Sequence, residues 1–119
     1  MELIKIINAR AVLESFSDKE DIGAHLAYWM TKFVAKTANE HKFYVAEMRK
    51  LFDKYADKKD DNLVVPPEKV AEFNVAVEAL NKTDVEEPNI RFNLSELAQE
   101  LKISMKQMYP LLDFIEEDK

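Results

Sequence analysis

The chain has 119 residues, of which 47% are apolar and 34% charged, a composition that suits one soluble globular domain with its own core. It contains no cysteine, which excludes disulfides, thiol catalysis and thiolate metal sites. The formal net charge is −6, and residues 61–119 hold 6 Lys or Arg against 13 Asp or Glu, which disfavours a nucleic-acid partner because cations must neutralise phosphates.

The N-terminal stretch "MELIKIINARAVLESF" is interrupted by charged residues and lacks the apolar core of a signal peptide. Nowhere does the chain contain an uninterrupted apolar run of about 18 residues, the length that a membrane-spanning helix needs. We therefore expect a cytoplasmic protein without a membrane partner. Within this stretch, "ELIKII" has the composition of a short strand, Asn8 is a candidate N-cap, and "ARAVLESF" predicts a two-turn helix.

A long helix is predicted from Ala24 to about Ala56, directly after Gly23, the only glycine. One stripe of residues recurs there at steps of three, four or seven: Leu26, Met30, Phe33, Thr37, Tyr44, Met48, Leu51 and Tyr55. The stripe is interrupted near residues 37–41. Such a helix would be about 50 Å long, so it must project, bend or pair with another helix.

The second helix of a hairpin follows a charged turn and the extended "NLVV". Pro67 suits the first helical position, where the missing N–H costs nothing. Val70, Phe73, Val77 and Leu80 then keep helical spacing, and the helix should end near residues 81–84. The two helices are expected to pack as an antiparallel hairpin, with part of the longer one left for another cover.

The C-terminal third predicts short elements. Ile90 and Phe92 indicate a short strand, Asn93 can cap a helix over "LSELAQEL", and Ser104 can cap "MKQMYPLLDFI". The short segments at the two chain ends are expected to meet as a small sheet.

The predicted fold class is α+β but predominantly α, a single domain over residues 1–119. A long antiparallel hairpin over about 24–84 stands on a small base of short strands and short helices, residues 1–23 and 85–119.

The segment 93–115 also resembles a helix-turn-helix. Against DNA binding, Pro110 interrupts the would-be reading helix, and that helix offers one cation, Lys106. Residues 94–119 hold 3 lysines against 6 acids. Apolar packing of two short helices explains the same pattern, and no DNA-binding residues are predicted.

No residue set indicates catalysis. His25 and His41 lie far apart on the long helix and lack an HExxH pattern, and a single glycine rules out a glycine-rich phosphate loop. We predict no catalytic residue, no metal ligand and no cofactor, and therefore a protein that is not an enzyme.

The candidate partner-binding residues are Tyr28, Trp29 and Phe33, since half-buried aromatics serve as anchors at interfaces. Packing of these aromatics in the core is the competing interpretation.

Several motifs, taken in order, resemble a family of small tailed-phage and prophage proteins of unknown function. They are "IKIINA" near the start, a long charged helix, "VPPEKVAEFN", "NKTDVE", "KIS" and "DFIEE". The similarity spans nearly the whole chain. "AYWMTKF" is more aromatic than is usual in that family, and Met105 stands where a proline is common.

The resemblance and the hairpin together predict a non-enzymatic phage or prophage protein-interaction module, of which a virion or assembly component is the first version. The alternative is an intracellular effector that binds and inhibits a host defence protein. A helix-turn-helix DNA-binding regulator is the least favoured. The partner is expected to be a phage structural protein or a host protein. The protein is expected in the host bacterial cytoplasm or in the virion. The sequence leaves open whether the chain forms a homo-oligomer.

Overall fold

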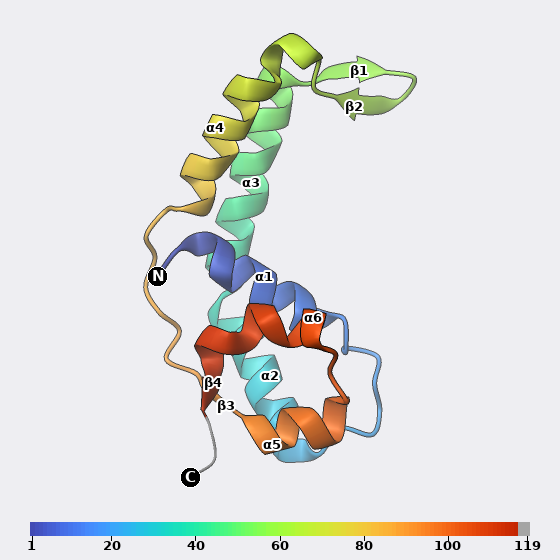
Figure 1. The fold of residues 1–119 in the computed structure, drawn as a ribbon, viewed down its shortest axis with the longest axis vertical. Coiled ribbons are helices and arrows are strands. Elements are labelled where there is room, and N and C mark those ends of the chain that lie inside the picture. Colours follow the sequence, from blue (N-terminus) through green and yellow to red (C-terminus); the bar gives the residue numbers. More distant parts are fainter. Residues whose placement is uncertain (117–119) are drawn as a thin grey trace.

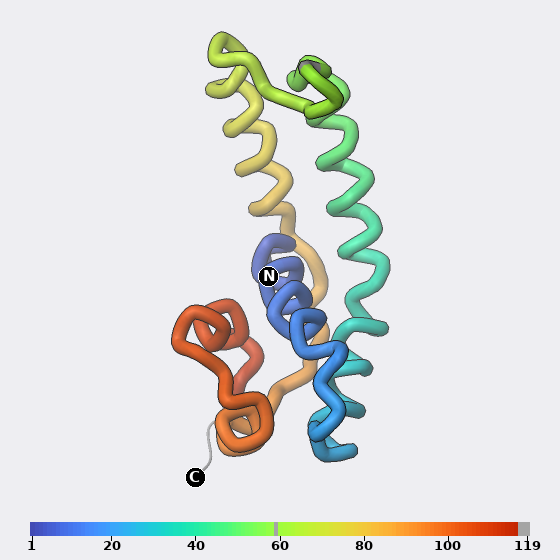
Figure 2. The backbone as a smooth tube through the Cα atoms, turned by 90° about the vertical axis from the view of Figure 1, so that its right-hand side faces the viewer, coloured from blue at the N-terminus to red at the C-terminus, as the bar shows by residue number. Residues whose placement is uncertain are grey.

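An arm of two antiparallel helices projects from a base that contains the core (Figures 1 and 2). The computed structural model describes residues 1–116, apart from the side chain of Lys59, so residues 117–119 of the predicted base lie outside the described residues. The principal extents are 51 × 31 × 24 Å. Helices dominate and the strands form only short pairs, which confirms the predicted fold class.

The first element is a helix, α1 (Leu3–Glu14), so the strand predicted over "ELIKII" is wrong, and Asn8 lies inside the helix instead of capping it. The isoleucines suggested a strand because β-branched side chains favour extended backbone. Burial decides otherwise, because the buried residues of α1 recur at helical spacing. They are Leu3, Ile6, Ala9, Arg10 and Leu13.

The long helix is divided at Thr37 into α2 (Ala24–Lys36) and α3 (Ala38–Tyr55). Gly23 is the N-cap of α2, which confirms the predicted start. Thr37 has φ −102° and ψ 12°, so the single continuous helix predicted from Ala24 to about Ala56 is wrong: the helix itself is broken where the sequence predicted only a gap in the apolar stripe. α2 buries Leu26, Met30 and Phe33, whereas none of the residues described in α3 is fully buried. The arm therefore begins at α3, and the predicted boundary at residue 24 is wrong because α2 belongs to the base.

Arg10 of α1 holds this bend. Its Nη1 donates hydrogen bonds to the carbonyl of Val34 and, at 3.0 Å, to Thr37 Oγ1, while Nη2 donates to Glu14 Oε1 at 2.9 Å. Thr37 Oγ1 in turn donates to the carbonyl of Phe33 at 2.7 Å. Arg10 is only 6% exposed, so these bonds compensate the loss of water around its charge.

The tip of the arm is a small hairpin in which β1 (Asp57–Lys59) pairs antiparallel with β2 (Asn62–Val64). Asp60 and Asp61 between them have φ values of 50° and 66°, as a two-residue hairpin turn with the correct twist requires. The sequence predicted a charged turn and an extended segment here, but not their pairing.

The arm returns through a 3₁₀ turn, η1 (Pro67–Lys69), and α4 (Val70–Asn81), which confirms the predicted start at Pro67 and the predicted end. Phe73 of α4 packs against two rings of α3, with centroids 5.3 Å from Phe52 and 6.1 Å from Tyr55. The antiparallel hairpin is thus present, over the outer part of the predicted range.

The C-terminal part wraps the base with short elements. They are β3 (Phe92–Asn93), α5 (Leu94–Glu96), the π-helical turn η2 (Leu97–Leu101), α6 (Met105–Met108), the 3₁₀ segment η3 (Tyr109–Phe114) and β4 (Ile115–Glu116). Both predicted caps are confirmed: Asn93 accepts from Glu96 N, and Ser104 forms a capping box with Gln107. The expected sheet between the chain ends is wrong, because β4 pairs parallel with β3, and the N-terminal segment contributes only a bridge from Glu2 to Asp84.

The core of the base joins α1, α2 and the C-terminal elements. Phe33 lies at its centre, with ring centroids 4.9 Å from Phe114 and 5.9 Å from Phe92, and all three side chains are at most 1% exposed. The base therefore has a closed core of its own, to which the arm is attached.

Replacing Phe33 by alanine should lower the free energy of unfolding by about 3–5 kcal/mol, because a buried ring is lost and a cavity is left. Phe43, which is 46% exposed on α3, is the matched control, and Phe43→Ala should cost less than about 1 kcal/mol. Urea denaturation of both variants measures the difference. Equal losses would contradict the assignment of Phe33 to the core.

Replacing Arg10 by methionine should lower the free energy of unfolding by about 1–3 kcal/mol, because buried acceptors at the bend lose their donor. A double-mutant cycle with Thr37→Val should show a coupling of about 0.5 kcal/mol or more, since the two side chains share a hydrogen bond. Arg49→Met on the exposed surface of α3 is the control. Additive effects of Arg10→Met and Thr37→Val would show that the bond between the two side chains contributes nothing.

Candidate functional site

Only two of the three aromatic residues predicted to bind a partner are exposed to solvent. Tyr28 is 57% and Trp29 37% exposed, but Phe33 is completely buried, so its inclusion in the surface is wrong. The reason is the helical period, since Phe33 follows Met30 and Leu26 on the core-facing side of α2. Tyr28 and Trp29 meet edge to face, with centroids 5.2 Å apart and planes at 85°. We call these two residues the aromatic pair.

A pocket of about 320 Å³ lies beside Trp29, between the start of α2 and the C-terminal strands. Its lining residues are His25, Leu26, Trp29, Arg91, Phe92, Asn93, Glu96 and Glu116. His25 Nδ1 lies 2.9 Å from Glu96 Oε2, and Asn93 Oδ1 accepts a hydrogen bond from the Glu96 backbone N–H. The aromatic spacing in the sequence indicates Trp29 but not the carboxylates, which come from positions about 70 and 90 residues further along the chain.

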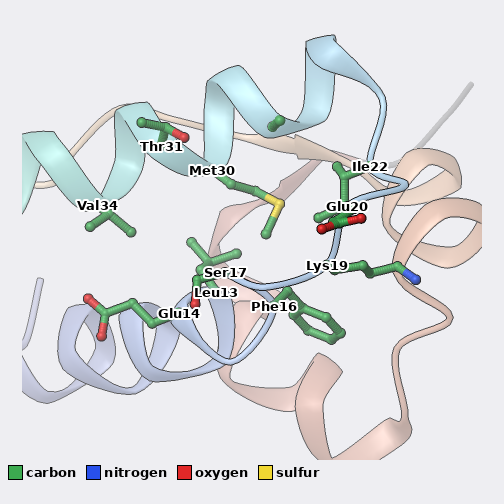
Figure 3. Close-up of a pocket in the computed structure, with 11 residues that line it drawn as sticks. Leu13, Glu14, Phe16, Ser17, Lys19, Glu20, Ile22, Met30, Thr31 and Val34 are labelled. Atoms are coloured by element: carbon green, nitrogen blue, oxygen red, sulfur yellow. The ribbon is translucent and has the colours of Figure 1, made fainter.

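A second pocket, of about 380 Å³, opens between the end of α1, the segment after it and α2 (Figure 3). Met30 and Phe16 point into it, and Leu13 and Val34 form part of its apolar wall. Glu20 and Lys19 lie at its edge, and Lys19 Nζ is 2.9 Å from Asp21 Oδ1, a hydrogen bond that lowers the pKa of Asp21. This pocket has the volume of a small-ligand site but few polar groups that converge on one point.

The arm carries several partly exposed apolar side chains. Among the described residues neither α3 nor α4 contains a fully buried one, and Val45, Leu63 and Val75 are 45%, 57% and 68% exposed. A hollow of about 310 Å³ beside α3 is lined by Val45, Phe52 and Leu63 among others. These apolar side chains of the arm thus lack the further layer of helices or strands that normally packs over such residues.

A smaller apolar patch lies on the C-terminal elements. Met105, Tyr109 and Leu112 are 89%, 76% and 55% exposed and follow one another at helical spacing. The apolar spacing of this segment predicted helices packed against the base, but in η3 only Leu111 and Phe114 are buried. Which apolar residues face the solvent depends on how the 3₁₀ segment is rotated about its axis relative to the base. The local sequence does not reveal this orientation.

The helix-turn-helix interpretation lacks its reading helix. α6 spans four residues and continues as a 3₁₀ segment through Pro110, so no α-helix of sufficient length is available for the major groove. Leu97, Leu101 and Leu111 are buried in the core of the base, which accounts for the apolar spacing.

In the part of the chain that the structure describes, no group of three His, Asp or Glu could hold a metal ion. His25 and His41 lie on α2 and α3, and His25 is engaged with Glu96. None of the helices in residues 1–116 is both long and apolar enough to cross a membrane.

Comparison with known proteins adds no relative: no family model, no curated protein and no solved structure matches the chain. The resemblance to phage proteins therefore stays a prediction.

If the segment 93–115 packs the base and does not read DNA, the protein should give no mobility shift with duplex DNA, even at about 50 mM salt, where phosphate contacts are strongest. A shift that falls steeply with added salt would restore the regulator hypothesis. Lys106→Ala should then weaken it, whereas Lys54→Ala on the arm serves as a charge-matched control.

Proposed function

We propose that this protein is a non-enzymatic interaction module of a phage or prophage, and that it binds a protein partner through the arm formed by α3, the β1–β2 tip and α4. The first version is a component of the virion or of its assembly, acting in the host cytoplasm or within the particle. The resemblance to small tailed-phage proteins supports the origin, and the arm supports the mode of action.

The observation that carries the proposal is the contrast in burial between arm and base. The base buries large side chains completely, among them Phe33, Phe92 and Phe114. The arm buries none completely among its described residues, although it contains Val45, Leu63 and Val75. Apolar surface that stays in water raises the free energy by roughly 25 cal/mol per Å², so a partner that covers the arm is favoured.

Affinity capture tests the proposal directly. The tagged protein is recovered from nuclease-treated cells that express the phage or prophage genes, and its companions are identified by mass spectrometry. A phage structural protein together with a fixed copy number in purified particles supports the assembly role. A host protein, with absence of this chain from particles, supports the alternative, an effector that inhibits a host defence protein.

Charges placed on the arm should weaken capture of the partner without unfolding the protein. Val45→Glu and Val75→Glu each put a carboxylate on an exposed apolar position, and each should weaken partner binding about tenfold or more, or about 1.4 kcal/mol. The free energy of unfolding should change by less than about 0.5 kcal/mol, since neither side chain is buried. Recovery in the capture experiment and urea denaturation measure the two effects.

Ala11→Glu, which adds the same charge to an exposed position of α1, is the matched control and should leave capture unchanged. Undiminished recovery with both arm variants would show that the arm is not the binding surface.

A further inference from the structure

We propose that the pocket beside Trp29 is an anchor site for an arginine side chain of the protein partner. This inference deepens the proposed function and rests on it, because it names the chemistry of one contact residue on the partner. The site is separate from the arm, so it would form a second point of contact.

The first support is the charge of the pocket. Glu96 and Glu116 contribute carboxylates to its lining, and Arg91 is its one permanent cation among the described lining residues. The charge of Arg91 is already matched, since Nη2 donates to Glu87 Oε1 and Nη1 donates to the carbonyl of Ile90 at 3.0 Å. The pocket therefore favours a cation.

The second support is the orientation of Glu96. One of its oxygens lies 2.9 Å from His25 Nδ1, and its backbone N–H is bound by Asn93 Oδ1 at 3.1 Å, as the start of α5. The Glu96 side chain is 28% exposed. The contact with His25 restrains the carboxylate itself, so it accepts hydrogen bonds from a ligand with less loss of side-chain entropy than a free one would.

The third support is the aromatic wall. Trp29 lines the pocket, and Tyr28 meets its ring edge to face at 5.2 Å, which restricts the indole. Cations bind the face of tryptophan, and a planar guanidinium can stack on the ring while its N–H groups reach a carboxylate. Arginine combines both contacts, which is why we choose it over lysine. The pocket volume of about 320 Å³ accommodates one such side chain.

The single tryptophan makes the test direct, because the ¹⁵N-labelled protein has only one indole N–H resonance, that of Trp29. The probe is the blocked tripeptide acetyl-Gly-Arg-Gly-amide, and its comparison is the citrulline peptide, which has nearly the same shape without the charge. The arginine peptide should shift the Trp29 resonance saturably with a millimolar Kd, and the citrulline peptide should bind about tenfold more weakly.

The substitutions Glu96→Gln and Glu116→Gln should each weaken the binding of the arginine peptide several-fold. Glu72→Gln, the same change of charge on α4 of the arm, should leave its binding unchanged. Urea denaturation checks that each variant remains folded.

Three results would overturn the inference: no shift of the Trp29 resonance with the arginine peptide up to about 50 mM, equal binding of the citrulline peptide, or equal weakening by Glu72→Gln. The proposed function fails differently, through capture that does not depend on Val45 and Val75. If capture depends on the arm but the arginine peptide does not bind, the arginine site is rejected and the proposed function of the arm stands.

Discussion

The bend at Thr37, held by Arg10, is the constraint on which the shape of this protein depends. An uninterrupted helix from residue 24 to residue 55 would run straight for about 50 Å. Arg10 instead binds the carbonyl of Val34 and the hydroxyl of Thr37 and ties α1 to the place where α2 ends. α2 can then turn its apolar side into the core while α3 leaves the base. A buried guanidinium is costly to desolvate, and it is tolerated here because acceptors from two helices bind its Nη1 and Nη2 groups.

The bend separates two regions of different packing. In the base, aromatic rings from α2 and the C-terminal elements meet within 6 Å and exclude water. In the arm, Phe73 contacts Phe52 and Tyr55, but the helices cover only one side of each other. Elements with few buried contacts open at lower free energy than the core does. The arm should therefore open at a lower free energy than the base.

The surface beside Trp29 is produced by the way in which the chain returns to the base. β3 and β4 pair in parallel and bring Asn93 and Glu116 next to one another, and α5 begins directly after Asn93. The start of α2 lies against these strands, so that His25 and Trp29 face the same pocket. Aromatic and acidic side chains are thereby combined in one place without any cluster of these residues in the sequence.

Local sequence determined the features that are made within one turn or one helix. Pro67 begins the returning segment of the arm, Asn93 and Ser104 cap their helices, and the apolar spacing of residues 44–55 and 70–80 predicts the two helices of the arm, because each depends on neighbours at most a few residues away. Tertiary structure alone decided the rest. It turned "ELIKII" into a helix, since burial against the base outweighs the strand preference of isoleucine, and it placed Phe33 in the core and Trp29 at the surface. It also brought Arg10 into hydrogen-bond contact with Thr37 and placed Glu116 and Trp29 around the same pocket, although these residues are distant along the chain and no local pattern encodes their proximity.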